Sequence, residues 1–159
     1  MVEAGRIARR LLALDDDPKC TDLVVRTALK CGYEAFPSND ERMLRQSIEA
    51  FRPDVLTLDL CMPELDAIEV FPLLRAARFR GRLIIISGQP DWLREQAKAI
   101  ASEHGLNVSA HMEKPINLGE LRTLLTVIRV GLIEAEERAL ATDSTMEIVR
   151  PVFTEARLK

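Results

Sequence analysis

The sequence contains few residues that form cross-links or bind soft metals. Its 159 residues include three cysteines and two histidines, His104 and His111, and no Cys-x-x-Cys pair. Cys20 and Cys31 are expected on one face of a helix, about three turns and ~16 Å apart, which is beyond the reach of a disulfide. A disulfide framework and a structural zinc site are therefore excluded, and the free thiols fit the reducing cytoplasm.

Long hydrophobic runs and an excess of positive charge are also missing. The aliphatic stretch 83–86 is far shorter than the ~20 residues that span a bilayer, and residues 6–14 are too short and too charged for a signal peptide. The net charge is -3, with acidic residues interspersed among the arginines. We therefore expect a cytoplasmic protein that neither enters a membrane nor binds nucleic acid directly.

Hydrophobic residues make up 47% of the chain and charged residues 30%, which is typical of one globular domain with at most a short appendage. Short apolar runs alternate with segments of helical periodicity. This alternation predicts a parallel sheet covered by helices on both faces. The predicted strands are residues 11–14, 33–36, 55–58, 83–86 and 108–112.

Capping signals separate the predicted elements. Asp17 and Pro18 open the first helix, and glycines at 32 and 105 end the first and fourth helices. Pro72 lies inside the third helix and predicts a kink there. We interpret Trp92, at the start of the fourth helix, as a packing residue, with contact to a partner as the alternative. Three capping pairs are predicted at the starts of the other helices: Ser38 with Glu41, Asp66 with Glu69, and Asn117 with Glu120.

The residues that end the strands carry the chemistry, because ligands of open parallel sheets bind outside the carboxyl ends of the strands. Asp15 and Asp16 follow the first strand, Asp59 the third, Ser87 ends the fourth, and Lys114 follows the fifth. Crowded carboxylates suit Mg²⁺, and a carboxylate beside a metal and an ammonium can accept a phosphoryl group. Asp59 is the candidate nucleophile, with Lys114 as the ammonium and the Ser87 hydroxyl as a hydrogen-bond donor.

Four motifs in register, LLALDDDP, DVLTLDLCMPELDAIEV, LIIISG and HMEKPI, resemble the receiver domain of two-component response regulators. The resemblance covers roughly residues 10–129. It implies a flavodoxin-like (βα)5 fold with strand order 2-1-3-4-5. The helical spacing of apolar residues beyond it predicts a C-terminal helical extension. We therefore expect a receiver domain over residues 1–130 and a helical linker or tail over residues 131–159.

The resemblance also implies roles for individual residues. Asp59 would take a phosphoryl group from a sensor histidine kinase or phosphotransfer protein, in a phosphorelay that switches partner or output-domain interactions. Such domains catalyse their own phosphorylation and are not classed as enzymes. The remaining roles are Mg²⁺ binding by Asp15, Asp16, Asp59 and the backbone carbonyl of Cys61, phosphate contact by Lys114 before a cis Pro115, and switching by Ser87 and His111.

Two positions depart from the family pattern, since Ala67 replaces a usual glycine and His111 replaces a usual aromatic ring. Three other functions compete with this interpretation. A haloacid-dehalogenase phosphatase needs a second aspartate where Cys61 stands, and a nucleotide or flavin binder needs a loop that does not repel phosphate, unlike residues 15–18. A phosphorylation-independent pseudoreceiver, acting as a protein-interaction module, is the remaining alternative.

The C-terminal part predicts a continuous helix and a homodimer, because apolar residues alternate four and three apart as in a coiled coil. These positions are Leu121, Leu125, Ile128, Leu132, Ala135 and Ala139. The stretch 146–153 reads as a strand. The segment RALATDSTMEIVRPVF resembles the opening of EAL domains, the cyclic-di-GMP phosphodiesterases. We therefore expect a truncated sequence with an EAL-type output domain to follow; the alternative is a stand-alone receiver whose remnant tail packs on a partner.

Overall fold

The computed structural model describes residues 8–60 and 67–158 of the chain. Strands and helices alternate as the sequence predicts, with one short 3-10 turn between the second strand and the second helix. The elements are β1 (Arg10–Leu14), α1 (Pro18–Lys30), β2 (Glu34–Ser38), the 3-10 turn (Glu41–Met43), α2 (Leu44–Phe51), β3 (Val55–Leu58), α3 (Ala67–Ala76), β4 (Arg82–Ser87), α4 (Asp91–Glu103), β5 (Asn107–Glu113) and α5 (Leu118–Leu158).

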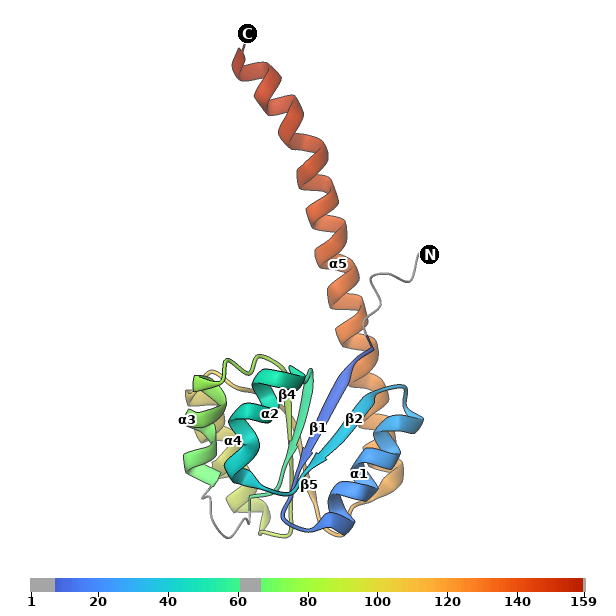
Figure 1. Cartoon of the computed structure of the whole chain (residues 1–159), viewed down its shortest axis with the longest axis vertical. Helices are drawn as coiled ribbons and strands as arrows, with labels where there is room; N and C mark the ends of the chain where they lie inside the picture. The colour runs from blue at the N-terminus through green and yellow to red at the C-terminus, as the bar shows by residue number, and fades with distance from the viewer. Residues whose placement is uncertain (1–7, 61–66, 159) are drawn as a thin grey trace. The chain divides into compact units, whose positions relative to one another are not determined.

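The five strands form one parallel sheet in the order β2-β1-β3-β4-β5, which confirms the predicted order 2-1-3-4-5. Helix α1 covers one face of this sheet, and α2, α3 and α4 cover the other (Figure 1). Because β1 and β3 are neighbours, the residues that follow them emerge side by side. The topology therefore brings the two acidic strand ends together.

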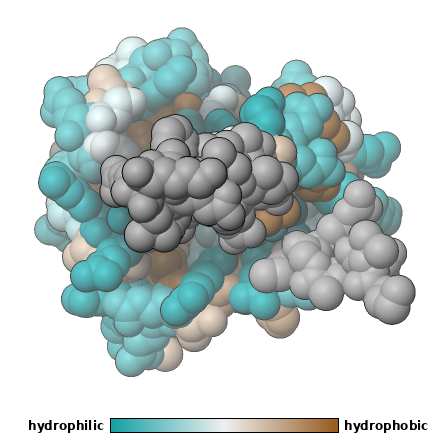
Figure 2. Space-filling view, turned by 90° about the horizontal axis from the view of Figure 1, so that it is seen from above, coloured by the Kyte–Doolittle hydropathy of each residue, from teal (hydrophilic) through white to brown (hydrophobic). Residues whose placement is uncertain are grey.

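The core consists of the strands and the inner faces of the helices. Every residue of β3 is buried, as are all residues of β1 and β4 except the first, which is the pattern of strands covered on both faces. Most of the coloured residues in the space-filling view are hydrophilic, with hydrophobic patches between them (Figure 2). Fully buried side chains include Leu11, Leu14, Leu44, Leu56, Leu58, Phe71, Leu74, Leu83, Ile84, Ile85 and Leu121.

Several predicted helix ends are confirmed. The Asp17 side chain accepts a hydrogen bond from Lys19 N at 3.0 Å, with Pro18 in the first helical position. Gly32 and Gly105 have positive φ where α1 and α4 end. At the start of α5, the Glu120 N–H donates to Asn117 Oδ1 at 3.0 Å.

The predicted capping box of Ser38 with Glu41 is wrong. Ser38 pairs with Leu14 as the last residue of β2, and α2 begins only at Leu44, after the 3-10 turn. Strand pairing fixes the backbone of Ser38 in the sheet, six residues before α2 begins, so Ser38 does not occupy the N-cap position of that helix. Pro72 lies within α3 as expected, whereas the predicted cap at Asp66 lies outside the described residues.

The predicted continuous helix at the C-terminus is confirmed, but the predicted strand 146–153 is wrong, since these residues belong to α5. A short apolar run cannot be distinguished from a buried helix segment by periodicity. Once a helix is nucleated, each further residue except proline adds one hydrogen bond, so a helix that begins upstream can continue into such a run. The chain divides into two compact units, Met1–Arg122 and Thr123–Lys159.

Among the described residues, none of the helices combines the length and the apolar character needed to span a bilayer. Cys20 and Cys31 are free thiols, as expected from their predicted separation.

Candidate functional site

Asp15 and Asp59 leave neighbouring strands next to each other. Leu14 and Leu58, the last residues of β1 and β3, are register partners, and the Asp59 N–H donates to the Leu14 carbonyl at 3.1 Å. Asp15 is 6% exposed and Asp59 is 5% exposed. Two carboxylates so withdrawn from water need a counter-charge close by.

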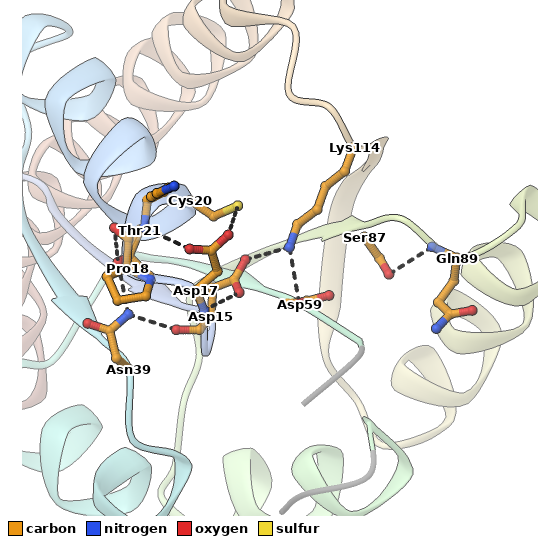
Figure 3. Close-up of polar contacts among 11 residues, drawn as sticks. Asp15, Asp17, Pro18, Cys20, Thr21, Asn39, Asp59, Ser87, Gln89 and Lys114 are labelled. Atoms are coloured by element: carbon orange, nitrogen blue, oxygen red, sulfur yellow. Dashed lines mark hydrogen bonds and ion pairs between the residues drawn. The ribbon is translucent and has the colours of Figure 1, made fainter. Parts of the chain in front are cut away.

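Lys114 supplies that counter-charge. Its backbone N–H donates to the Ser87 carbonyl at 3.1 Å, which fixes the chain beyond β5, and the following bond to Pro115 is cis, as expected. The ammonium donates to Asp15 Oδ2 at 2.7 Å and to Asp59 Oδ2 at 3.1 Å (Figure 3). Burial lowers the pKa of Lys114, but hydrogen bonds to the two carboxylates and their charges raise it above the usual value overall. The ammonium therefore stays charged at neutral pH.

Asn39, which sequence reasoning missed, and Asp17, the predicted helix cap, hold Asp15 in place. Asn39 Nδ2 donates to the Asp15 carbonyl at 2.8 Å and to Thr21 Oγ1 at 2.9 Å (Figure 3). The Asp17 N–H donates to Asp15 Oδ1 at 2.9 Å. The signal for Asn39 was its place directly after β2, the strand beside β1.

Asp16 completes an acidic cluster. One carboxylate oxygen each of Asp15, Asp16 and Asp59 lies within 4.8 Å of the other two. Burial raises the pKa of Asp16, as do a side-chain hydrogen bond with Asp15 and the negative charges of Asp15 and Asp59. Three carboxylates and one ammonium leave excess negative charge, and hard oxygen ligands of this kind fit Mg²⁺. The fourth predicted ligand, Cys61, lies outside the described residues.

Ser87, the predicted switch hydroxyl, is fully buried at the end of β4. Its Oγ accepts a hydrogen bond from the Gln89 N–H at 3.2 Å (Figure 3). The other predicted switch residue, His111, lies on β5, with its side chain 19% exposed. Its Nδ1 accepts a hydrogen bond from Arg94 Nε at 3.3 Å, and its Nε2 lies 2.8 Å from Glu95 Oε1.

Arg94 is the main residue that sequence reasoning missed. It is 6% exposed on α4. Ala97 and Ala101 lie on the same buried stripe, three and seven residues further along, and that spacing was the signal that could have found it. The interpretation of Trp92 as a packing residue is wrong, because its side chain is 67% exposed. It lies in the first turn of α4, two residues before Arg94, which at 100° per residue places it on the opposite side of the helix from the stripe.

The family model of the response regulator receiver domain matches residues 11–126. The chain belongs to this family. Receiver domains are the phosphoacceptor domains of two-component response regulators, and their role is signalling. PhoP of Bacillus subtilis, an alkaline phosphatase synthesis transcriptional regulatory protein, is 24% identical over 136 residues, which cover 85% of this chain and 55% of PhoP.

Response regulator MprA of Mycobacterium leprae is 28% identical over 151 residues, covering 94% of this receiver and 60% of MprA. The chain thus spans between half and two thirds of the length of these relatives. Among solved structures, a response regulator from Colwellia psychrerythraea is 27% identical with a TM-score of 0.64, covering 76% of this chain and 96% of that one. Vibrio cholerae chemotaxis protein CheY4 shares the fold, with 22% identity, a TM-score of 0.65 and coverage of 77% and 99%.

Proposed function

We propose that Asp59 is the phosphoacceptor of this receiver. The observation that carries the proposal is the Lys114 ammonium, which bridges Asp15 and Asp59 at 2.7 and 3.1 Å. A cation in this position can neutralise an oxygen of a phosphoryl group that approaches Asp59. The donor would be the phosphohistidine of a sensor histidine kinase or a phosphotransfer protein, which the response regulator relatives make the expected partner.

The acidic cluster fits a magnesium ion. Asp15, Asp16 and Asp59 would hold Mg²⁺ through their carboxylates, with the Cys61 carbonyl as the further ligand implied by the family resemblance. When bound, the ion supplies positive charge to the phosphoryl oxygens and relieves the repulsion among the three carboxylates.

The transfer requires little covalent chemistry from the protein. A carboxylate oxygen of Asp59 attacks phosphorus, an O–P bond forms, and the P–N bond to the kinase imidazole breaks; the departing imidazole nitrogen then takes a proton from water. Lys114 holds charge against the phosphoryl group throughout, and the Ser87 hydroxyl donates a hydrogen bond to it after transfer. Asp59 and Lys114 need no proton exchange, because both act in their charged forms.

Labelling of Asp59 tests the proposal directly. Incubation of the full chain with Mg²⁺ and acetyl phosphate should add one acid-stable, base-labile phosphoryl group, detected by intact-mass spectrometry. Asp59→Asn should abolish this labelling, and omission of Mg²⁺ should strongly reduce it. Asp22→Asn, which removes an exposed carboxylate of α1 paired with Arg26, is the matched control and should label like the wild type. Undiminished labelling of Asp59→Asn would refute the assignment.

The same experiment separates this function from the pseudoreceiver alternative. A pseudoreceiver would remain folded with Mg²⁺ and acetyl phosphate present yet acquire no phosphoryl group. The presence of Asp15, Asp59 and Lys114 in mutual contact favours the phosphoacceptor.

We further propose that residues 1–130 act as the receiver and that the helical tail 131–159 transmits its state to an EAL-type output domain or a partner in the cytoplasm. The family match ends at residue 126, whereas α5 extends to Leu158. Amide hydrogen exchange of the tail, compared with and without phosphorylation, tests this transmission. An exchange pattern that phosphorylation leaves unaltered in the tail would contradict it.

A further inference from the structure

A continuous chain of hydrogen bonds connects Ser87 to the surface of α4. The Gln89 N–H donates to Ser87 Oγ at 3.2 Å, and the Gln89 carbonyl accepts from Arg94 Nη1. Arg94 Nε in turn donates to His111 Nδ1 at 3.3 Å. The chain ends where His111 Nε2 meets Glu95 Oε1 at 2.8 Å. The guanidinium of Arg94 thus joins the loop after β4 to the side chain of His111 on β5.

Arg94 is suited to such a link because its orientation is constrained. Its side chain is 7% exposed, and its third contact is an ion pair from Nη2 to Asp91 Oδ1 at 3.3 Å. A buried guanidinium is costly unless its N–H groups are bonded, and its planar shape fixes the directions of those bonds relative to one another. A displacement of the Gln89 carbonyl is therefore passed to Nε rather than absorbed by rotation of a flexible chain.

The contacts of Arg94 also fix the tautomer of His111. Nε of arginine can only donate, so Nδ1 of His111 is the acceptor, and the hydrogen of the neutral ring lies on Nε2 and is donated to Glu95. Each ring nitrogen thus has one partner, on two different residues of α4. A movement of Arg94 therefore changes the environment of this ring directly.

The same region holds a second group of metal-ligating side chains, Asp91, Glu95 and His111, within 4.8 Å of one another. The guanidinium of Arg94 already contacts Asp91 and His111, so a metal ion would have to displace this cation from its buried bonds. The contacts therefore favour a hydrogen-bonded relay over a metal site.

We propose that Arg94 is a positioning residue that transmits the state of Ser87 to His111. The proposal rests on phosphorylation of Asp59. When the Ser87 hydroxyl turns to the phosphoryl group, it ceases to accept from the Gln89 N–H, and the loop that carries the Gln89 carbonyl is released. Arg94 follows this carbonyl, and its Nε changes position against Nδ1 of His111. A buried arginine thereby links the hydroxyl to the imidazole, which takes the place of an aromatic ring on β5.

The imidazole resonances of His111 report this step, and His104 provides an internal reference at the other end of α4. NMR spectra of the full chain are recorded with Mg²⁺, before and after saturation with beryllofluoride, a stable mimic of the phosphoryl group. Phosphorylation by acetyl phosphate is measured separately by mass spectrometry. In the wild type we expect shifts of the His111 ring and the Gln89 amide and little change at His104.

Arg94→Met should retain wild-type labelling of Asp59 and the shift of the Gln89 amide but lose the His111 shift. Arg94→Lys keeps the charge but lacks the planar guanidinium, so it should restore at most part of the His111 shift. This variant also tests the proposal if Arg94→Met does not fold. Arg26→Met, which removes an arginine paired with Asp22 on α1, is the control and should respond like the wild type.

The outcomes of the two proposals are distinguishable. A wild-type chain that gains no phosphoryl group refutes the proposed function. A labelled wild type together with labelled Arg94 variants that keep the full His111 shift refutes the relay alone.

Discussion

The ammonium of Lys114 lies closer to Asp15 than to Asp59, at 2.7 Å against 3.1 Å. Lys114 is therefore a counter-ion for the metal-binding side of the cluster as well as for the proposed nucleophile. Its side chain is 22% exposed, while those of its partners are 8% and 6% exposed. Without a metal, this one cation stabilises both buried carboxylates.

Removal of the ammonium should accordingly destabilise the metal-free protein. We expect Lys114→Met to lower the free energy of unfolding by ~1–3 kcal/mol in EDTA, because two carboxylates lose a charged hydrogen-bond donor. Mg²⁺ should still bind to the variant. It should reduce the difference in the free energy of unfolding between variant and wild type, because it replaces the lost positive charge. Urea denaturation with EDTA and with Mg²⁺ measures both effects.

Lys30→Met, at the exposed C-terminal end of α1, is the control for loss of one positive charge and should change stability little. Equal stability of Lys114→Met and wild type in EDTA would show that Lys114 does not neutralise the cluster. Phosphorylation of Lys114→Met should produce a weaker His111 response, because the ammonium contacts the phosphoryl group rather than the metal.

Asp16 should show the opposite effect. Burial and the neighbouring carboxylates raise its pKa, so its proton is bound more tightly in the folded than in the unfolded chain. Its negative charge therefore opposes folding above the folded-state pKa, and this cost disappears as the pH falls through that value. We expect Asp16→Asn to raise stability at pH 7 without metal by about 0.5 kcal/mol, the scale of one solvent-screened like-charge pair.

The gain should shrink as the pH is lowered through the pKa of Asp16, because protonation of the wild-type carboxyl has the same effect as the substitution. Mg²⁺ affinity of the wild type should fall over the same interval, since protons compete for the ligand. Thermal unfolding and calorimetric Mg²⁺ titration measure these changes. Both are carried out from pH 4, near the usual carboxyl pKa values, to pH 7, in steps of ~1 pH unit. A metal-free Asp16→Asn less stable than wild type at pH 7 would contradict the prediction.

The sheet order and the convergence of Asp15, Asp59 and Lys114 could be predicted from the sequence, because both follow from residues at strand ends in a parallel sheet. The contacts of Arg94 could not. An arginine in a helix is usually exposed, and only its spacing from Ala97 and Ala101 marks it as buried. Its partners, the Gln89 carbonyl and His111, come from a loop and a strand whose positions depend on the tertiary structure.

The wrong helix cap at Ser38 and the wrong strand at 146–153 have a similar cause. Ser38 has the chemistry of a helix cap, but pairing with β1 takes precedence over capping. The stretch 146–153 has the β-branched residues of a strand, yet it continues a helix that begins at Leu118. In both cases the decisive interaction involves residues outside the local segment that carries the signal.

Substitution of Gly81 probes the packing at the start of β4, at the end of the sheet away from the site. A Cβ at this position would overlap the backbone carbonyl of Asp54 and lie 2.8 Å from Phe79 Cε1. The backbone of Asp54 is itself fixed, because its carbonyl accepts from the Arg82 N–H at 2.8 Å. We expect Gly81→Ala to destabilise the chain by ~1–3 kcal/mol, as overpacking does elsewhere.

Gly131→Ala is the matched substitution, since a Cβ there meets nothing within 4 Å and the residue lies inside α5. It should increase helix stability by ~1 kcal/mol, the difference in helix propensity. Urea denaturation of the Gly81 variant and thermal melting of the α5 helix signal by circular dichroism measure the two effects. If Gly81→Ala leaves the free energy of unfolding unchanged, the loop before β4 can shift to accommodate the added methyl group.

The last prediction concerns self-association through α5. Within the unit Thr123–Lys159, Ala135, Ala139 and Leu140 are exposed and Leu132 is partly exposed. An isolated helix gains most of its stability from packing an apolar face, so this seam is expected to pair with a second copy of the chain. Sedimentation equilibrium should show a dimer in the wild type. Leu132→Glu should shift it to monomer, whereas Glu134→Gln, an exposed position outside the seam, should not. A concentration-independent monomer, with and without phosphorylation, would rule out the dimer and leave α5 to a different partner.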